Sequence, residues 1–232
     1  MTTPGRKQDE AADYNTPQEQ MAFLQPVCDA WADLYCRVSN EIGQEESLDT
    51  KKETLHLKLF PLLTADVDMF GMVGKEKTVI PTVEKFFLES YAKNLYWDYK
   101  VVDRKDWPEE AFAFASEQKE PQLADAHWAA TGPVDNNSLS CPLIAVFQFS
   151  RYWDDSVEGK RKVAHNGIEL IELEVRDKSS STQQELLNNA LVKESESRTP
   201  PSDDFLSARL VAKRFAYLRK PDPPEPATEL KG

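Results

Sequence analysis

The residue best suited to acid–base chemistry in this sequence is His127, which stands beside apolar residues in a stretch with strand character. A histidine on an inward-facing strand can act as a general acid or base near neutral pH. Asp125 lies two residues earlier, so the two side chains share a strand face, and its carboxylate would orient the ring or raise its pKa. The alternative is a partly buried structural histidine. His127 and Asp125 are therefore catalytic candidates.

A second candidate is the pair Asp66 and Asp68, which alternates onto one face of a short expected strand. Paired carboxylates divide an acid and a base role when their environments differ. Solvent-facing aspartates on a half-exposed strand are the commoner explanation of the same pattern. Asp66 is kept as a substrate-binding candidate.

Aromatic residues are frequent, and part of them could line a pocket for an oxygenated ring compound, although ordinary core packing explains them equally well. The set comprises Tyr35, Tyr96, Trp97, Tyr99, Trp128, Phe147, Phe149, Tyr152 and Trp153. The candidates for substrate binding are Trp31, Trp128, Phe147, Phe149, Tyr152 and Asp66.

No cofactor or metal is expected. The sequence has no GxGxxG, P-loop or HExxH pattern, so dinucleotide, nucleotide and zinc-protease functions lack support. It has three cysteines without CxxC or CxxH spacing, and Cys28 and Cys36 lie about 12 Å apart along one expected helix. This usage argues against a disulfide framework and a zinc site, and fits a reducing compartment.

The charge balance bears on partners, because 28 basic residues stand against 40 acidic ones, a formal net charge of −12. Such a surface repels nucleic-acid phosphates and anionic lipids. No stretch approaches the roughly 20 apolar residues of a membrane span, and residues 1–15 lack the apolar centre of a signal peptide. We expect a cytoplasmic protein whose partner is a small hydrophobic oxygenated ligand, with no nucleic acid and no membrane; a homodimer stays open.

The first half of the chain predicts helices around one strand. Thr16 and Pro17 form a helix start, and apolar residues then recur at three- and four-residue steps to about Asn40. Pro26 is expected to kink this helix. A capping pattern at Thr50 begins a shorter helix, residues 65–71 alternate as a strand, and another helix follows residue 74.

The second half predicts an antiparallel meander with strands over 95–102, 112–116, 126–134, 143–152 and 163–175, and a bulge near Leu170. A helix is expected from Thr182, and an amphipathic, locally basic one over 204–220, which covers the sheet or docks on a partner. The predicted organisation is a disordered N-terminus (1–15), an α+β domain (16–176), a C-terminal helical extension (177–220) and a disordered proline-rich tail (221–232).

This order of elements resembles the NTF2-like superfamily, over residues 17 to 176. Two segments carry the resemblance. Residues 62–71 have the sequence Leu-Leu-Thr-Ala-Asp-Val-Asp-Met-Phe-Gly, which looks like that superfamily's first strand. Gly-Lys-Glu and a helix with Val83, Phe86 and Phe87 follow, and they look like its third helix. The resemblance implies an NTF2-like cone, in which N-terminal helices pack on a curved antiparallel sheet around an apolar pocket.

Within the superfamily, the sequence is most similar to scytalone dehydratase and SnoaL-like polyketide cyclases. Trp31 to Tyr35 resembles the first-helix motif with its pocket tyrosine, and Ala126-His127-Trp128 resembles a strand with a catalytic histidine. Cys36 stands where the family has a catalytic aspartate, and the strand ending at Tyr152 offers no second histidine.

The resemblance implies a cofactor-independent lyase, cyclase or isomerase of secondary metabolism that acts on a small aromatic or polyketide-like substrate. His127 would move the proton, and Tyr35 and Tyr152 would hydrogen-bond the substrate oxygen. The alternative is a non-catalytic NTF2-like module that binds a partner or oligomerises through the outer face of its sheet.

Overall fold

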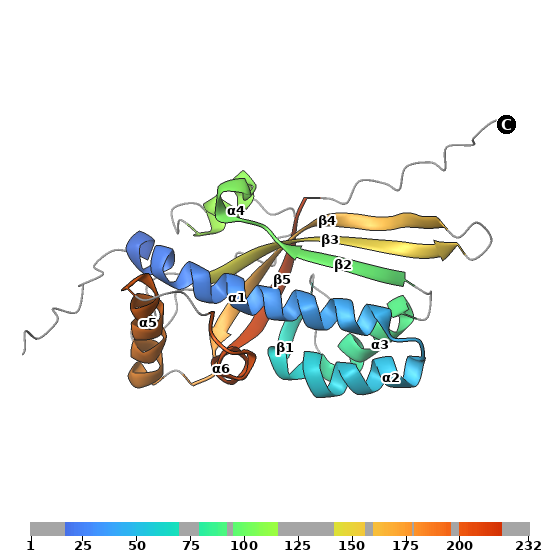
Figure 1. Ribbon diagram of the computed structural model, residues 1–232, viewed down its shortest axis with the longest axis horizontal. Helices are drawn as coiled ribbons and strands as arrows, with labels where there is room; N and C mark the ends of the chain where they lie inside the picture. Colours follow the sequence, from blue (N-terminus) through green and yellow to red (C-terminus); the bar gives the residue numbers. More distant parts are fainter. Residues whose placement is uncertain are drawn as a thin grey trace, which may run out of the picture.

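A mixed, open five-stranded sheet with helices packed against it forms the α+β fold of the computed structural model (Figure 1). The described residues are 17–69, 79–91, 95–115, 142–155, 160–177, 179–195 and 200–219. The strands are β1 (Leu63–Met69), β2 (Leu95–Val101), β3 (Leu143–Asp155), β4 (Lys160–Val175) and β5 (Leu210–Arg219). Their order in the sheet is β1-β5-β4-β3-β2, with β1 parallel to β5 and the other neighbours antiparallel.

One long helix, α1, lies along the sheet, while the short helix α4 lies on the sheet's other side (Figure 1). The helices are α1 (Pro17–Gln44), α2 (Leu48–Thr54), α3 (Val79–Tyr91), α4 (Glu109–Ala115), α5 (Ser180–Ser195) and α6 (Asp203–Arg209). A π-helical turn (Leu55–Leu59) and 3₁₀ turns (Phe60–Leu62, Arg104–Asp106) connect them to the strands. Within the described ranges no helix is long and apolar enough to cross a membrane.

Helix α1 begins as the sequence predicts and buries one stripe against the sheet. It continues as one helix through Pro26, whose side chain is exposed. The indole Nε1 of Trp31 donates to the carbonyl oxygen of Leu210 at 3.1 Å. This bond joins the middle of α1 to the first residue of β5.

Three predicted strands of the meander match β2, β3 and β4, and the expected irregularity near Leu170 is confirmed by shifts in the β4–β5 register on both sides of it. The strand expected over 112–116 is wrong, because Glu109–Ala115 is helix α4. Its alanines favour helix, and Glu109 and Glu110 complement the positive end of the helix dipole. The strand expected over 126–134 lies outside the described residues.

The helix expected over 204–220 is wrong for most of its length, because α6 ends at Arg209 and residues 210–219 form β5. This strand lies inside the sheet, between β1 and β4, and most side chains on both of its faces are buried. Burial on both faces removes the alternation that identifies a strand from sequence. Its basic residues find acidic partners on neighbouring strands: Arg214 lies 3.5 Å from Glu172 and 3.9 Å from Asp68.

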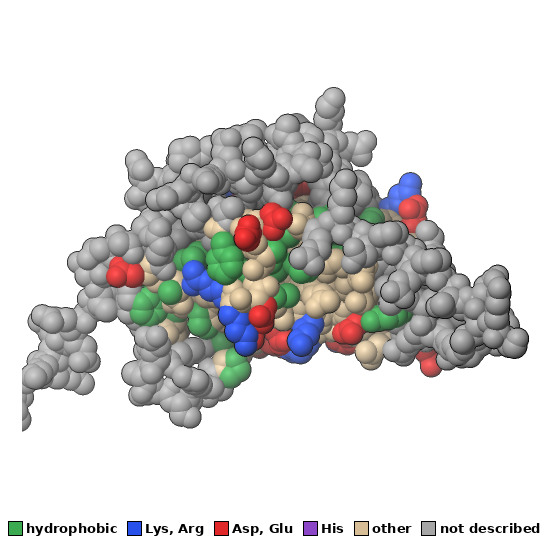
Figure 2. Space-filling model, turned by 90° about the horizontal axis from the view of Figure 1, so that it is seen from above, with side chains coloured by type: hydrophobic (Ala, Val, Ile, Leu, Met, Phe, Trp, Pro, Cys, Tyr) green, Lys and Arg blue, Asp and Glu red, His purple; other side chains and the backbone are tan. Residues whose placement is uncertain are grey.

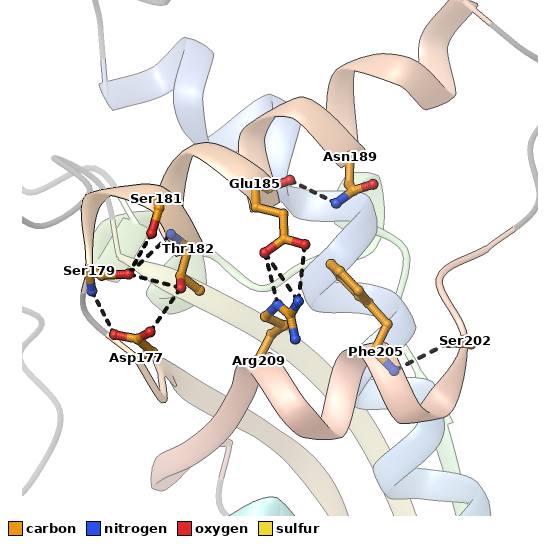
Figure 3. A network of polar contacts seen from close by, with 9 residues as sticks. All are labelled: Asp177, Ser179, Ser181, Thr182, Glu185, Asn189, Ser202, Phe205 and Arg209. Atoms are coloured by element: carbon orange, nitrogen blue, oxygen red, sulfur yellow. Dashed lines mark hydrogen bonds and ion pairs between the residues drawn. The ribbon is translucent and has the colours of Figure 1, made fainter.

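Helices α5 and α6 are joined by the polar contacts in Figure 3. The hydroxyl of Ser179 accepts from the amide of Thr182 at 3.3 Å, so α5 begins one turn before the Thr182 pattern that predicted it. Asp177 accepts from the Ser179 amide at 3.0 Å. The Nη2 atom of Arg209 in α6 donates to both carboxylate oxygens of Glu185 in α5, at 3.0 and 3.1 Å. These contacts hold the C-terminal helices at one end of the sheet.

Charged side chains of both signs lie next to each other on the described part of the face in Figure 2. Ion pairs such as Arg37 with Asp203 (2.7 Å) and Lys52 with Glu84 (3.0 Å) show the same mixing in detail. Exposed pairs of this kind contribute at most about 1 kcal/mol each. They therefore shape the surface more than they stabilise the fold.

Candidate functional site

The face of the sheet that α1 covers is filled around Tyr35, which is 2 % exposed. Its ring stacks on Trp31 and Tyr99, at centroid distances of 5.9 and 6.2 Å. It also meets Phe147 of β3 at 5.8 Å and Phe215 of β5 at 5.2 Å. Helix α1 and three strands thus meet in one aromatic cluster, which contributes packing beyond its buried area.

A polar cluster follows on the same face of the sheet, formed by Tyr99, Arg151, Glu169 and Tyr217. Register explains how they meet: Glu169 of β4 is paired with Phe147 of β3 on one side and with Tyr217 of β5 on the other. Residues paired across antiparallel strands share a face. Side chains alternate along β3, so Arg151, two positions after Phe149, lies on the same face as Phe147 and Phe149. The cluster therefore takes one side chain from each of the strands β2, β3, β4 and β5.

The guanidinium of Arg151 is held by aromatic rings and a hydroxyl. Its Nη2 donates to the hydroxyl oxygen of Tyr99 at 3.3 Å. Its central carbon lies 4.9 Å from the centroid of the Phe149 ring and 5.9 Å from that of Phe86 in α3. Arginine stays charged at any physiological pH, and contact with ring faces stabilises such a cation.

Glu169 is 2 % exposed, and burial raises the pKa of its carboxyl group to about 8. The nearby charge of Arg151 and a hydrogen bond with the hydroxyl of Tyr217 oppose this shift without cancelling it. The Oε1 atom has no hydrogen-bond partner among the described residues. At neutral pH the group therefore keeps its proton and can donate it, as a general acid requires.

The two tyrosines that border the cluster are also perturbed. Burial raises the pKa of the Tyr99 hydroxyl. Burial also raises the pKa of Tyr217, and the negative charge of Glu169 adds to this effect. Both hydroxyls thus remain protonated over the physiological range and act as hydrogen-bond donors.

Asn40 of α1 fixes the position of Tyr99 on the edge strand β2. Its Nδ2 donates to the carbonyl oxygen of Tyr99 at 3.2 Å, and its Oδ1 accepts from the amide of Tyr99 at 3.0 Å. One side chain thereby satisfies both backbone polar groups of a strand residue, as a neighbouring strand would. Helix α1 in this way sets the place of the hydroxyl that meets Arg151.

Replacement of Asn40 by alanine is expected to lower the free energy of unfolding by about 2 kcal/mol, because two hydrogen bonds of roughly 1 kcal/mol each are lost. Urea unfolding followed by circular dichroism measures the change. Asn188→Ala, at an exposed position of α5, is the matched control and should change stability by less than about 0.5 kcal/mol. An Asn40→Ala protein as stable as this control would refute the role given to Asn40.

The residues predicted from sequence fall into three groups. His127, Asp125 and Trp128 lie outside the described residues. Trp31, Tyr35, Phe147 and Phe149 lie together, each at most 2 % exposed, on the face that α1 covers. Asp66 is exposed on the edge strand β1, and Tyr152 is half-buried on the face opposite to Arg151.

Sequence reasoning missed Arg151, Glu169 and Tyr217 as functional candidates. A signal for Arg151 exists, because it continues the alternation of Phe147 and Phe149 onto the inner face. Glu169 stands between Ile168 and Leu170, where the alternation of apolar and polar residues shifts by one position. The sequence therefore does not predict on which face of the sheet Glu169 lies. Tyr217 lies in the segment that the sequence predicts as a helix, so the sequence does not predict which face of the sheet it occupies.

Neither the cysteines nor any acidic cluster in the described ranges forms a metal site. No group of three or more histidine, cysteine, aspartate or glutamate residues there could hold an ion. Cys36, which takes the place of the aspartate in the resembled motif, is 2 % exposed, and burial raises the pKa of its thiol. A buried thiol of this kind behaves as a small apolar side chain.

Comparison with known proteins gives no match: no family model, no curated protein and no solved structure is significantly similar to the chain.

Proposed function

We propose that the protein is a cofactor-independent acid–base enzyme, a lyase, cyclase or isomerase, that acts on a small aromatic or polyketide-like carbonyl compound. The observation that carries the proposal is a carboxyl group with a raised pKa, Glu169, buried next to Arg151 and two tyrosine hydroxyls on one sheet face. Perturbed groups of this kind are enriched at functional sites. The proposed setting is an NTF2-like cone in a cytoplasmic protein, with a homodimer as its assembly.

The chemistry assigned to the cluster is proton transfer at a carbonyl compound. Glu169, protonated near neutral pH, donates a hydrogen bond or a proton to the carbonyl or leaving hydroxyl oxygen. Arg151 stabilises negative charge that develops on that oxygen. His127 is proposed as the base that removes the proton from the neighbouring carbon, so that two groups divide the acid and base roles.

The order of elements also supports the proposal. A long helix, an edge strand, a helix and then antiparallel strands follow one another, and the last strand, β5, pairs in parallel with the first. Helix α1 packs Tyr35 against Tyr99 of β2 and Phe215 of β5, and the hydroxyl of the same Tyr99 contacts Arg151 of the polar cluster. Sites between a sheet and its covering helices are frequent places for small-molecule chemistry.

The experiment that tests the proposal measures exchange of carbon-bound protons in D₂O. The full chain is incubated with a panel of aryl ketones, 1,3-diketones and hydroxynaphthalenones, and loss of the proton signal next to the carbonyl is followed by NMR. Dehydration, aldol cyclisation and isomerisation all pass through removal of this proton. We expect exchange above the buffer rate for at least one compound, reduced roughly 100-fold or more in Glu169→Gln and His127→Ala.

His56→Ala is the matched control, since His56 is a partly exposed histidine that lies 3.3 Å from Glu84 on the helical side of the molecule. It should leave the exchange rate unchanged. Exchange that persists in both Glu169→Gln and His127→Ala would place the chemistry elsewhere, and absence of exchange across the panel would refute the enzyme.

The second candidate function is a non-catalytic NTF2-like module for binding or oligomerisation. It is favoured by the dense aromatic packing around Tyr35, where Trp31, Phe147, Phe149 and Phe215 are each at most 1 % exposed. Side chains that fill the α1 face leave less room for a substrate there. Concentration-dependent sedimentation without any proton exchange would support this candidate over the enzyme.

A further inference from the structure

A partly open pocket of about 230 Å³ lies at the edge of the sheet, away from the polar cluster. Its lining residues come from the 3₁₀ turn before β1, from β1, from α3 and from the residue after β4: Phe60, Leu63, Thr64, Ala65, Val67, Val83 and Arg176. A water molecule takes about 30 Å³ of liquid volume, so the pocket has room for roughly eight non-hydrogen atoms. Most of its wall is hydrocarbon, which favours an apolar ligand body.

Among the described lining residues Arg176 is the only charged one, and carbonyl oxygens hold its guanidinium in place. Its Nε donates to the carbonyl oxygen of Ser207 at 2.9 Å, and its Nη2 donates to that of Pro61. Its own amide donates to the carbonyl of Arg209 at 2.9 Å. The side chain is therefore fixed by neutral acceptors from two segments, and its orientation is set before any ligand arrives.

No carboxylate of the described residues lies within ion-pair distance of Arg176, although the chain carries 40 acidic residues against 28 basic ones. Two nearby arginines do have acidic partners: Arg209 has Glu185, and Arg214 has Glu172. A fixed guanidinium that has no acidic partner among the described residues attracts an anion, and its planar donors match a carboxylate.

Thr64 adds a second polar group to the pocket. Its Oγ1 is buried and has no hydrogen-bond partner within the described ranges. A buried hydroxyl without a partner is unfavourable, and a ligand oxygen that accepted from it would remove this penalty. The lining thus combines one cation, one hydroxyl donor and an apolar wall.

We propose that this pocket binds a small organic acid, with Arg176 and the Thr64 hydroxyl on the carboxylate and with Phe60, Val67 and Val83 around a short hydrocarbon body. The site is separate from the polar cluster of Glu169 and does not depend on the proposed enzymatic function. The chemical class is a monocarboxylate of about eight non-hydrogen atoms, for which hexanoate is a direct probe.

The test titrates the full chain with sodium hexanoate and follows amide NMR signals to saturation. Hexanamide, which keeps the body and loses the charge, and acetate, which keeps the charge and loses the body, are each expected to bind at least tenfold more weakly. Saturable binding with both preferences supports the proposal. Equal binding of hexanamide and hexanoate, or no saturable binding of hexanoate, overturns it.

Variants locate the binding at the pocket. Ala65→Leu fills it from an exposed position that tolerates a larger side chain, and it should abolish hexanoate binding. Arg176→Gln should weaken hexanoate at least tenfold. Arg37→Gln removes an exposed guanidinium from α1 with the same change of net charge and should alter the affinity less than twofold. Unchanged binding in a folded Ala65→Leu protein would overturn the assignment even if Arg176→Gln fails to fold.

Discussion

A chain that ends at Arg209 is expected to have no cooperative unfolding transition, because it lacks β5. That strand lies between β1 and β4, and within the described sheet it is the only neighbour of β1. It contributes the buried side chains of Leu210, Val211, Phe215 and Leu218. At roughly 2 to 3 kcal/mol for each buried large apolar side chain, the loss is about 10 kcal/mol, comparable with the whole stability of a typical domain.

The matched control is a chain that ends at Arg219, which keeps all of β5 and should unfold cooperatively near the temperature of the full chain. Thermal and urea unfolding of both shortened chains, followed by circular dichroism and tryptophan fluorescence, measures the difference. In a full-length chain, Phe215→Ala tests the same strand more gently and should cost about 3 to 5 kcal/mol. A cooperative transition in the chain that ends at Arg209 would show that β5 is dispensable, against its central place in the sheet.

The second large effect is a change in the pH dependence of stability when Glu169 becomes glutamine. The native carboxyl has a pKa of about 8, against 4.5 as its ordinary value. Below pH 4.5 both native and unfolded forms hold the proton. Between these values the native protein retains a proton that the unfolded chain releases, so the free energy of unfolding falls as pH rises, and above about pH 8 it falls no further. At 1.36 kcal/mol per pH unit the total loss is roughly 4 to 5 kcal/mol.

Glutamine keeps the shape of the side chain and cannot ionise, so Glu169→Gln should lose this dependence. The variant and the natural protein should be of similar stability at pH 5, and the variant should be more stable by about 4 kcal/mol at pH 8. Urea unfolding at pH 5, 6, 7 and 8 provides the comparison. Burial also raises the pKa of Asp29 to about 6, which adds a decline of the same sign, but it is common to both proteins and cancels in the difference.

Glu109→Gln, at an exposed position of α4, controls for the loss of one negative charge from an acidic chain. Its stability should run parallel to that of the natural protein at every pH. Parallel curves for Glu169→Gln as well would mean that the carboxyl group is not held in its protonated form.

The helical half of the fold follows from local signals in the sequence. Helix α1 has a proline and a glutamate in its first turn and apolar residues at helical spacing, and both features act within a few residues of each other. The α2 region was also found, although the hydroxyl of Ser47, rather than Thr50, accepts from the first turn. Strands β1 and β2 form the two edges of the sheet, and the sequence predicts both within two residues of their places, 65–71 against Leu63–Met69 and 95–102 against Leu95–Val101.

The last strand could not be recognised, because its identity depends on neighbours far away in the sequence. Val211, Phe215 and Leu218 recur at spacings that a helix shares, and burial on both faces leaves no polar side to reveal alternation. Only the pairing with Leu63 to Met69 on one side and with β4 on the other makes this segment a strand.

The sequence points to the aromatic residues that lie together on the α1 face, but not to the polar cluster beside them. Tyr35 and Phe147 lie on apolar stripes that sequence periodicity exposes. Glu169 and Tyr217 come together only through the register of β4 and β5, and Arg151 joins them from the neighbouring strand β3. Long-range register of this kind is not encoded in local spacing.

The parallel pairing of β1 with β5 has a consequence for how the chain is made. Ribosomes add roughly 5 to 20 residues per second, and 141 residues separate Met69 from Leu210, so β1 waits about 7 to 30 seconds for its partner. Once Val175 completes β4, the edge of that strand is open to pairing with another chain until β5 follows. Contacts between residues so distant in sequence also slow folding itself. Nascent chains should therefore depend on chaperones that shield strand edges until the last strand has emerged.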